Sequence, residues 1–143
     1  MMKALIDTNV IIDYLANRIP FADDAERIFD LCEQGELTGV LTASAMTDVY
    51  YIMRKSIGHE KAMDCMKLLF SIFDIANVGK DDLLRAMESG LKDFEDALVA
   101  VCARRIKAEC IITRNTSDFT KAAVLPMTPR NFMERFFPDM KEE

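Results

Sequence analysis

The 143-residue sequence lacks a long uninterrupted apolar run. Hydrophobic residues make up 50% of the chain, but charges such as Asp48 and Lys67 interrupt the longest apolar stretches. None of them approaches the roughly 20 residues that a membrane-spanning helix needs. Asp7 stands too close to the start for the apolar core of a signal peptide to precede it. We therefore expect a protein without a membrane segment that stays in the cytoplasm.

Cysteine and histidine are scarce, and their spacing speaks against two common kinds of structural site. The four cysteines form no C-x-x-C pair and no close cluster with histidine, so neither a zinc site nor a disulfide framework is expected. Each has apolar neighbours, which favours small buried thiols. The single histidine, His59, follows Gly58 and is expected at the surface, outside catalysis. The cysteines are Cys32, Cys65, Cys102 and Cys110.

Positive charge is also in short supply. The chain has 18 lysines and arginines against 24 aspartates and glutamates, a formal net charge of −6. A protein that coats nucleic acid through a broad basic surface needs the opposite balance, because Lys and Arg neutralise the phosphates. A nuclease is not excluded, since two divalent cations at a carboxylate site would bring the formal charge to −2.

No internal repeat, low-complexity stretch or flexible linker divides the chain. With 29% charged residues and half the chain apolar, the composition is that of an ordinary globular protein and differs from that of a disordered one. We expect a single domain over residues 1–138, followed by an acidic tail, 139–143, that frays from it.

Short apolar segments alternate with longer amphipathic ones along the chain. Parallel strands need crossover connections of roughly a dozen or more residues, which the amphipathic segments can supply as helices. This order predicts an α/β fold with a central parallel sheet of about five short strands flanked by helices. Ile52 and Phe94 are among the side chains expected to face inward. The expected strands cover 3–6, 39–41, 74–78, 110–113 and 124–125, and the expected helices cover 10–15, 21–34, 45–57, 60–72, 80–89, 94–107 and 128–137.

Two aspartates are expected where strands of this sheet end. Asp7 directly follows the first strand, and Asp118 comes shortly after the strand 110–113. In parallel α/β folds, ligands bind beyond the carboxyl ends of the strands. We therefore expect both side chains near a ligand site.

Three further aspartates lie on helices that flank this edge. Asp93 and Asp96 are three residues apart on the helix before the strand 110–113, and one of the pair can point toward the strand ends. Asp48 borders the inward stripe of an earlier helix. Several carboxylates in one place would repel one another, but they are the ligands that Mg²⁺ and Mn²⁺ prefer. The pattern favours a divalent cation site.

Each acid also has a local explanation when it is taken alone. Asp7 and Asp118 could cap a helix or form a turn, and Asp93 with Glu95 could begin a helix whose dipole favours acids. Asp48 could lie on the exposed edge of an amphipathic helix. A phosphohydrolase of the haloacid dehalogenase type also has an aspartate after its first strand. That enzyme needs a second aspartate two residues later as general acid, and Asn9 stands there instead.

Four segments of the sequence resemble the motifs of the PIN domain family. The first is an aspartate followed by a Thr-Asn turn, and the other three each carry one acid. Asp48 stands where the family more often has glutamate, so a direct metal bond and a bond through water are both compatible with this position. The segments are LIDTNV (5–10), TDVY (47–50), DALVA (96–100) and TRNTSDF (113–119).

The resemblance implies a ribonuclease that hydrolyses RNA phosphodiesters, usually in single strands, and leaves 5′-phosphate and 3′-hydroxyl ends. It implies that Mg²⁺ or Mn²⁺ is held by Asp7, Asp96 and Asp118, with Asp48 as the fourth catalytic acid. Many bacterial members are toxins with a co-expressed antitoxin protein, and homodimers are common among them. The residues that look like supporting or substrate-orienting groups are Asn9, Asp93, Thr113, Arg114 and Asn115.

A second reading of the same resemblance is a PIN-like module that has lost catalysis and binds RNA or protein. The glutamate-to-aspartate difference at Asp48 leaves this reading open, while Asp7, Asp96 and Asp118 favour the enzyme. A metal titration with and without RNA separates the two.

Overall fold

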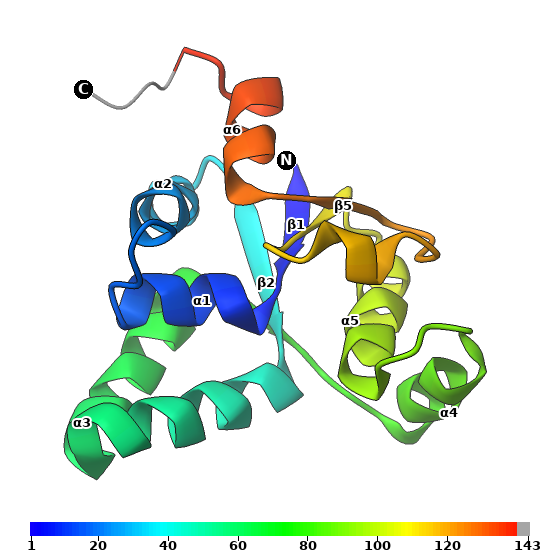
Figure 1. The fold of residues 1–143 in the computed structure, drawn as a ribbon, viewed down its shortest axis with the longest axis horizontal. Helices are drawn as coiled ribbons and strands as arrows, with labels where there is room; N and C mark the ends of the chain where they lie inside the picture. The colour runs from blue at the N-terminus through cyan, green and yellow to red at the C-terminus, as the bar shows by residue number, and fades with distance from the viewer. Residues whose placement is uncertain (140–143) are drawn as a thin grey trace.

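The computed structural model describes residues 1–139, so the frayed tail expected at 139–143 lies outside the described residues except for Asp139. Strands and helices alternate in the predicted order (Figure 1). The elements are β1 (Lys3–Ile6), α1 (Thr8–Leu15), α2 (Ala22–Glu33), β2 (Thr38–Thr42), α3 (Ala43–Ile72), β3 (Asp74–Ala76), α4 (Lys80–Glu88), α5 (Phe94–Arg105), β4 (Cys110–Ile112), the short 3₁₀ helix η1 (Thr116–Phe119), β5 (Leu125–Met127) and α6 (Pro129–Phe136).

The five strands form one parallel sheet in the order β3-β2-β1-β4-β5, which confirms the predicted fold class. The first strand of the chain lies in the centre, where Ile6 is level with Ile112 of β4. The chain runs from β1 outward to one side through β2 and β3, then crosses back to β4 and β5. The gap between β1 and β4 is therefore the point at which the strand order reverses, which is where α/β sheets bind ligands.

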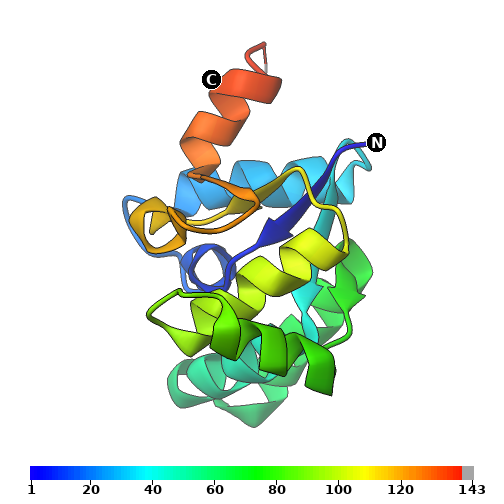
Figure 2. The same ribbon diagram turned by 90° about the vertical axis from the view of Figure 1, so that its right-hand side faces the viewer.

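Helices cover both faces of the sheet, and the central strand β1 is apolar on both sides. Ala4 and Ile6 of β1 join the core that includes α1, α2, α3 and α6, while Leu5 faces the core formed with α4 and α5. Figure 1 shows α1 and α2 on one side of β1 and β2 and α4 and α5 on the other, with α6 above the strands, and Figure 2 shows α4 lying along α5.

Helix α3 is bent at Gly58, where the sequence predicted a break between two helices. Gly58 has φ 84° and ψ 172°, which is not a helical conformation and is one that glycine adopts readily. Across the bend, the Tyr50 hydroxyl lies 2.7 Å from Nδ1 of His59, which is exposed as predicted. Among residues 1–139, no helix combines the length and the apolar character that crossing a membrane requires.

The cysteines lie largely in the core, as predicted, and none is disulfide-bonded. Burial raises the pKa of Cys32 and of Cys110 to about 12, so neither thiol ionises near neutral pH. The prediction that Phe94 and Ile52 face inward is wrong, because their side chains are 49% and 39% exposed. Phe94 is the first residue of α5 and forms part of the wall of a cavity that Asp7 also lines.

Candidate active site

Asp7 directly follows β1 at the point where the strand order reverses, and its two carboxylate oxygens serve different purposes. Oδ1 accepts a hydrogen bond from the Thr8 amide at 2.9 Å and so caps α1. Oδ2 accepts from the Thr113 hydroxyl at 2.8 Å. The capping explanation considered from the sequence is therefore correct for one oxygen, while the other belongs to a network that reaches β4.

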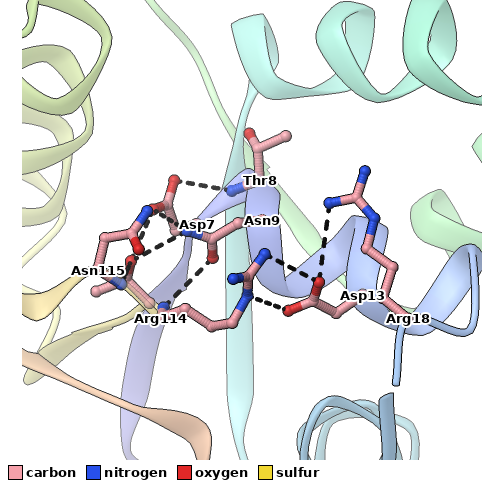
Figure 3. Close-up of polar contacts among 8 residues, drawn as sticks. Asp7, Thr8, Asn9, Asp13, Arg18, Arg114 and Asn115 are labelled. Carbon is pink, nitrogen blue, oxygen red and sulfur yellow. Dashed lines mark hydrogen bonds and ion pairs between the residues drawn. The ribbon is translucent and has the colours of Figure 1, made fainter. Parts of the chain in front are cut away.

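Thr113 and two asparagines build this network between the ends of β1 and β4 (Figure 3). The Asn9 side-chain amide donates to Asp7 Oδ2 at 3.3 Å. The Thr113 hydroxyl, which is fully buried, accepts from the backbone amide of Asn115 at 3.0 Å while it donates to Asp7. Two of the polar residues expected to support the site, Asn9 and Thr113, thus bond directly to Asp7, while Asn115 acts on it through Thr113.

The pKa of Asp7 is raised despite these hydrogen bonds. Burial is the main cause, and the negative charges of Asp118 and Asp93 add to it. The bonds from Thr113 and Thr8 act in the opposite direction because they stabilise the ionised form. A carboxylate held in this state is stabilised by any cation that comes near it.

Asp96 lies in the first turn of α5, opposite the end of β1. Burial raises its pKa to about 6, with contributions from the charges of Asp93, Asp7 and Asp118. Asp93 is the residue just before α5, and its Oδ1 accepts from the Asp96 amide at 3.0 Å. Asp93 is therefore the helix cap, and Asp96 is the member of the pair that shares a cavity with Asp7.

Asp48 lies in the second turn of α3 and lines a cavity of about 330 Å³ together with Asp7, Glu95 and Asp96. We call this the Asp48 cavity. Repulsion by Asp48 is the main cause of a raised pKa at Glu95, and burial and the charge of Asp93 add to it. Sequence reasoning assigned Glu95 only to the start of a helix and so missed it as a site residue.

Asp118 lies in η1 and borders a second cavity of about 370 Å³, which also has Asp93 and Asp96 in its wall. We call this the Asp118 cavity. Asp96 lines both cavities, so it connects the acid contributed by η1 with the acids at the ends of β1 and in α3. The four predicted catalytic aspartates thus come together at one edge of the sheet, distributed over two adjoining cavities.

Arg114 has a different environment from the one expected for a substrate-orienting residue. Its guanidinium group binds Asp13 through two contacts, Nε to Oδ2 at 2.6 Å and an Nη to Oδ1 at 3.2 Å. It also lies 4.1 Å from the centre of the Phe21 ring. Figure 3 shows Arg18 approaching Asp13 from the other side, with an N to O distance of 3.9 Å. The side chain of Arg114 is therefore engaged in neutralising Asp13, which is 1% exposed.

In the described part of the chain, the acids of the site have no such partners. Among residues 1–139, no lysine or arginine forms an ion pair with any of the four predicted catalytic aspartates. Carboxylate oxygens are suitable ligands for a hard divalent cation, so the donor chemistry fits such an ion. Within the same described part of the chain, however, no three acidic, histidine or cysteine side chains are placed to hold one ion together.

Comparison with known proteins identifies the family to which this chain belongs. The family model described as "PIN domain" matches residues 3–117. Ribonuclease VapC1 of Aquifex aeolicus (strain VF5) is 29% identical over 147 residues, covering 94% of this chain and 95% of the relative.

Two solved structures share the fold at low sequence identity. VapBC2 from Rickettsia felis, bound to a DNA fragment from its promoter, superposes with a TM-score of 0.70 at 15% identity and covers 89% of this chain and 98% of that one. VapC20 of Mycobacterium tuberculosis, described as a Sarcin-Ricin loop cleaving toxin, gives a TM-score of 0.69 at 13% identity, with 85% and 96% covered.

Proposed function

Because this chain belongs to the PIN domain family, we propose that it is an endoribonuclease that hydrolyses phosphodiester bonds of single-stranded RNA with Mg²⁺ or Mn²⁺. The observation that carries the proposal is the group of carboxylates at the β1/β4 reversal point, which lack a basic partner among the described residues. A folded chain that keeps such a group uncompensated is prepared to bind a cation.

The residues that would hold the ion are Asp7, Asp96 and Asp118, with Asp48 directly or through water. Their side chains would have to move closer together on binding, because within residues 1–139 no three of them are placed to share one ion. When bound, a divalent cation lowers the pKa of a water ligand and stabilises the charge that develops on a phosphodiester. The ligands lie in two adjoining cavities that share Asp96, so Asp96 is the acid best placed to serve both.

The remaining residues of the site position these carboxylates. Thr113 and Asn9 both donate hydrogen bonds to Oδ2 of Asp7. The backbone amide of Asn115 in turn donates to the Thr113 hydroxyl and fixes its position. Asp93 fixes the start of α5 and with it the backbone of Asp96. Asn9 also accepts from the Arg114 amide at 3.4 Å, which links the site to the Asp13 ion pair.

Glu95 adds a negative charge that the sequence did not assign to the site. It lines the Asp48 cavity beside Asp48 and Asp96, and the charge of Asp48 is the main cause of its raised pKa. Its carboxylate would add to the negative charge that attracts a divalent cation to this cavity.

The partners of the relatives suggest those of this chain. The Rickettsia felis protein is a VapBC complex, and a toxin–antitoxin complex from Klebsiella pneumoniae shares the fold with a TM-score of 0.66 at 23% identity. We propose that this chain likewise pairs with an antitoxin protein, forms a homodimer and acts in the cytoplasm, with residues 1–138 as one nuclease domain.

The test is incubation of the purified chain with structured and unstructured RNAs in Mn²⁺, beside Asp7→Asn and Asp96→Asn. Each substitution removes a charge but almost no volume, so the fold should persist. Cleavage should fall by more than about 100-fold. The loss of a residue that only supports a metal ligand costs up to about that factor. The products of the parent should carry 5′-phosphate and 3′-hydroxyl ends.

Asp23→Asn serves as the matched control, since Asp23 is an exposed acid in the first turn of α2. It should cleave like the parent. A parent that binds RNA without cleaving it would overturn the proposal in favour of an RNA-binding module. Unfolding of the Asp7 or Asp96 variant would show a structural role for that residue.

A further inference from the structure

A cavity of about 590 Å³ lies beside α4 and α5, and four of the eleven residues in its wall are basic. It carries four basic residues and one acid, Glu88, in a chain whose net charge is −6. Small residues such as Ala100 and Ala122 form part of its wall and leave the space open. The basic residues are Arg85, Arg104, Arg105 and Lys121, and we call the space the basic cavity.

The four basic side chains differ in whether the fold already pairs them with an acid. Arg105 is bound to Asp82, with Nε and Oδ1 2.9 Å apart, and to the Asn77 carbonyl. Arg104 and Lys121 are exposed and form no ion pair within residues 1–139. The stability of the fold therefore does not account for these two charges.

The basic cavity continues into the acidic edge. Leu91 and Lys121 line both the basic cavity and the Asp118 cavity, so the two spaces adjoin. Helix α5 runs along both, with Asp96 at its acidic end and Arg104 two turns later. Eight residues of helix correspond to about 12 Å. An extended RNA strand that reacts beside Asp96 can reach Arg104 within a few nucleotides.

We propose that the basic cavity binds backbone phosphates of the RNA strand on one side of the cleaved bond, through Arg104 and Lys121. The inference rests on the proposed function, because it takes the acidic edge as the place where the phosphodiester reacts. Two positively charged side chains at the far end of the adjoining cavities complement the repeated negative charge of an RNA strand. They would hold the substrate in register while the acids at the strand ends act on it.

The experiment measures RNA binding at several salt concentrations in the full-length Asp7→Asn chain, which does not cleave if the proposed function is correct. The probe is a labelled single-stranded oligouridine of about 12 nucleotides. Arg104→Gln/Lys121→Gln is added to this background and compared with Lys61→Gln/Lys67→Gln, two exposed lysines of α3 outside the basic cavity. Both pairs remove two positive charges, so they change the net charge equally.

The loss of two phosphate contacts should flatten the slope of log K against log salt by about 1.4 and weaken binding about tenfold near 0.15 M salt. The control pair should leave the slope unchanged. Equal slopes in the two pairs, with a parent that still cleaves RNA, would overturn the inference and leave the proposed function intact. A parent that cleaves no RNA removes the proposed function and the inference with it.

A free nucleotide is the other possible source of phosphate. Uridine monophosphate should compete with the oligomer only weakly, because it offers one phosphate and no path to the acidic edge. If the mononucleotide binds the parent as tightly as the oligomer does, and Arg104→Gln/Lys121→Gln abolishes that binding, the cavity is a nucleotide site and the proposed strand path is wrong.

Discussion

This protein has two kinds of buried or partly buried carboxylate, and they differ in whether an arginine forms an ion pair with them. Asp13 and Asp82 are 1% and 5% exposed, and each is bound by an arginine from a distant part of the chain. Asp7 and Asp96 are partly buried as well, but no basic side chain within residues 1–139 forms an ion pair with them. The first kind is neutralised within the fold, and the second has no ion-pair partner among the described residues.

The pKa values express the same contrast. A hydrogen bond from the Gly79 amide, together with Arg105, lowers the pKa of Asp82. Burial and neighbouring acids raise the pKa of Asp96 to about 6. The ionised form is thus stabilised in one place and destabilised in the other, which separates an acid used for structure from one available for chemistry.

The largest effect on stability is expected when an ion-paired buried acid loses its arginine. Arg114→Gln should lower the free energy of unfolding by about 3–5 kcal/mol, because Asp13 would remain buried with only Arg18 nearby. Urea unfolding measures this value. In the double variant Asp13→Asn/Arg114→Gln part of the loss should return, since no unpaired charge remains. A single variant as stable as the parent would mean that the ion pair contributes nothing.

The next largest effect concerns Asp7, which belongs to the acids without an ion pair in the described part of the chain. Mn²⁺ at about 100 times its Kd should stabilise the parent by about 2.7 kcal/mol, since it binds only the folded chain. Asp7→Asn relieves repulsion, so without metal it should melt at or above the parent, and it should gain little from Mn²⁺. Melting curves with EDTA and with millimolar Mn²⁺ test this. An equal metal shift in both proteins would exclude Asp7 as a ligand.

A smaller effect is expected from pH when divalent ions are removed. The folded pKa of Asp96 lies above its value of 3.8 in the unfolded chain, so the stabilisation is complete below 3.8 and is lost as pH rises through about 6. Going from pH 7 to pH 5 should therefore stabilise the parent by about 1 kcal/mol once solvent screening is allowed for.

Asp96→Asn should remove most of this gain, while Asp82→Asn should keep it, because the lowered pKa of Asp82 acts only at lower pH. Chemical denaturation at the two pH values gives the comparison. An Asp96→Asn protein with the full gain would assign the effect to another group.

The smallest change is expected for Asp48→Glu. The longer side chain restores the residue that is commoner in the family, so RNA cleavage in Mn²⁺ should be retained or improved, with any loss below about tenfold. Because Asp48 also contacts Glu95, the variant tests how much room the Asp48 cavity has. Complete inactivation with an intact fold would show that the position accepts only aspartate.

The sheet and the approximate place of the site could be predicted from the sequence, since both depend on local patterns. Apolar segments of the right length indicated the strands, and Asp7 was tied to the end of one of them. The partner of Asp13 could not be predicted, because Arg114 is 101 residues away and reaches it only in the folded chain. Glu95 was missed for the same reason, since its contact with Asp48 joins the starts of two separate helices.

The central position of β1 also has a consequence for the order in which the protein can become complete during synthesis. Strand β1 pairs with β4, and Asp7 takes its hydrogen bond from Thr113, more than a hundred residues later. Contacts so distant in sequence form late, after most of the chain has left the ribosome. A chain interrupted anywhere before β4 therefore carries Asp7 on an unfinished sheet, and translation must pass Asp118 before all four aspartates can meet.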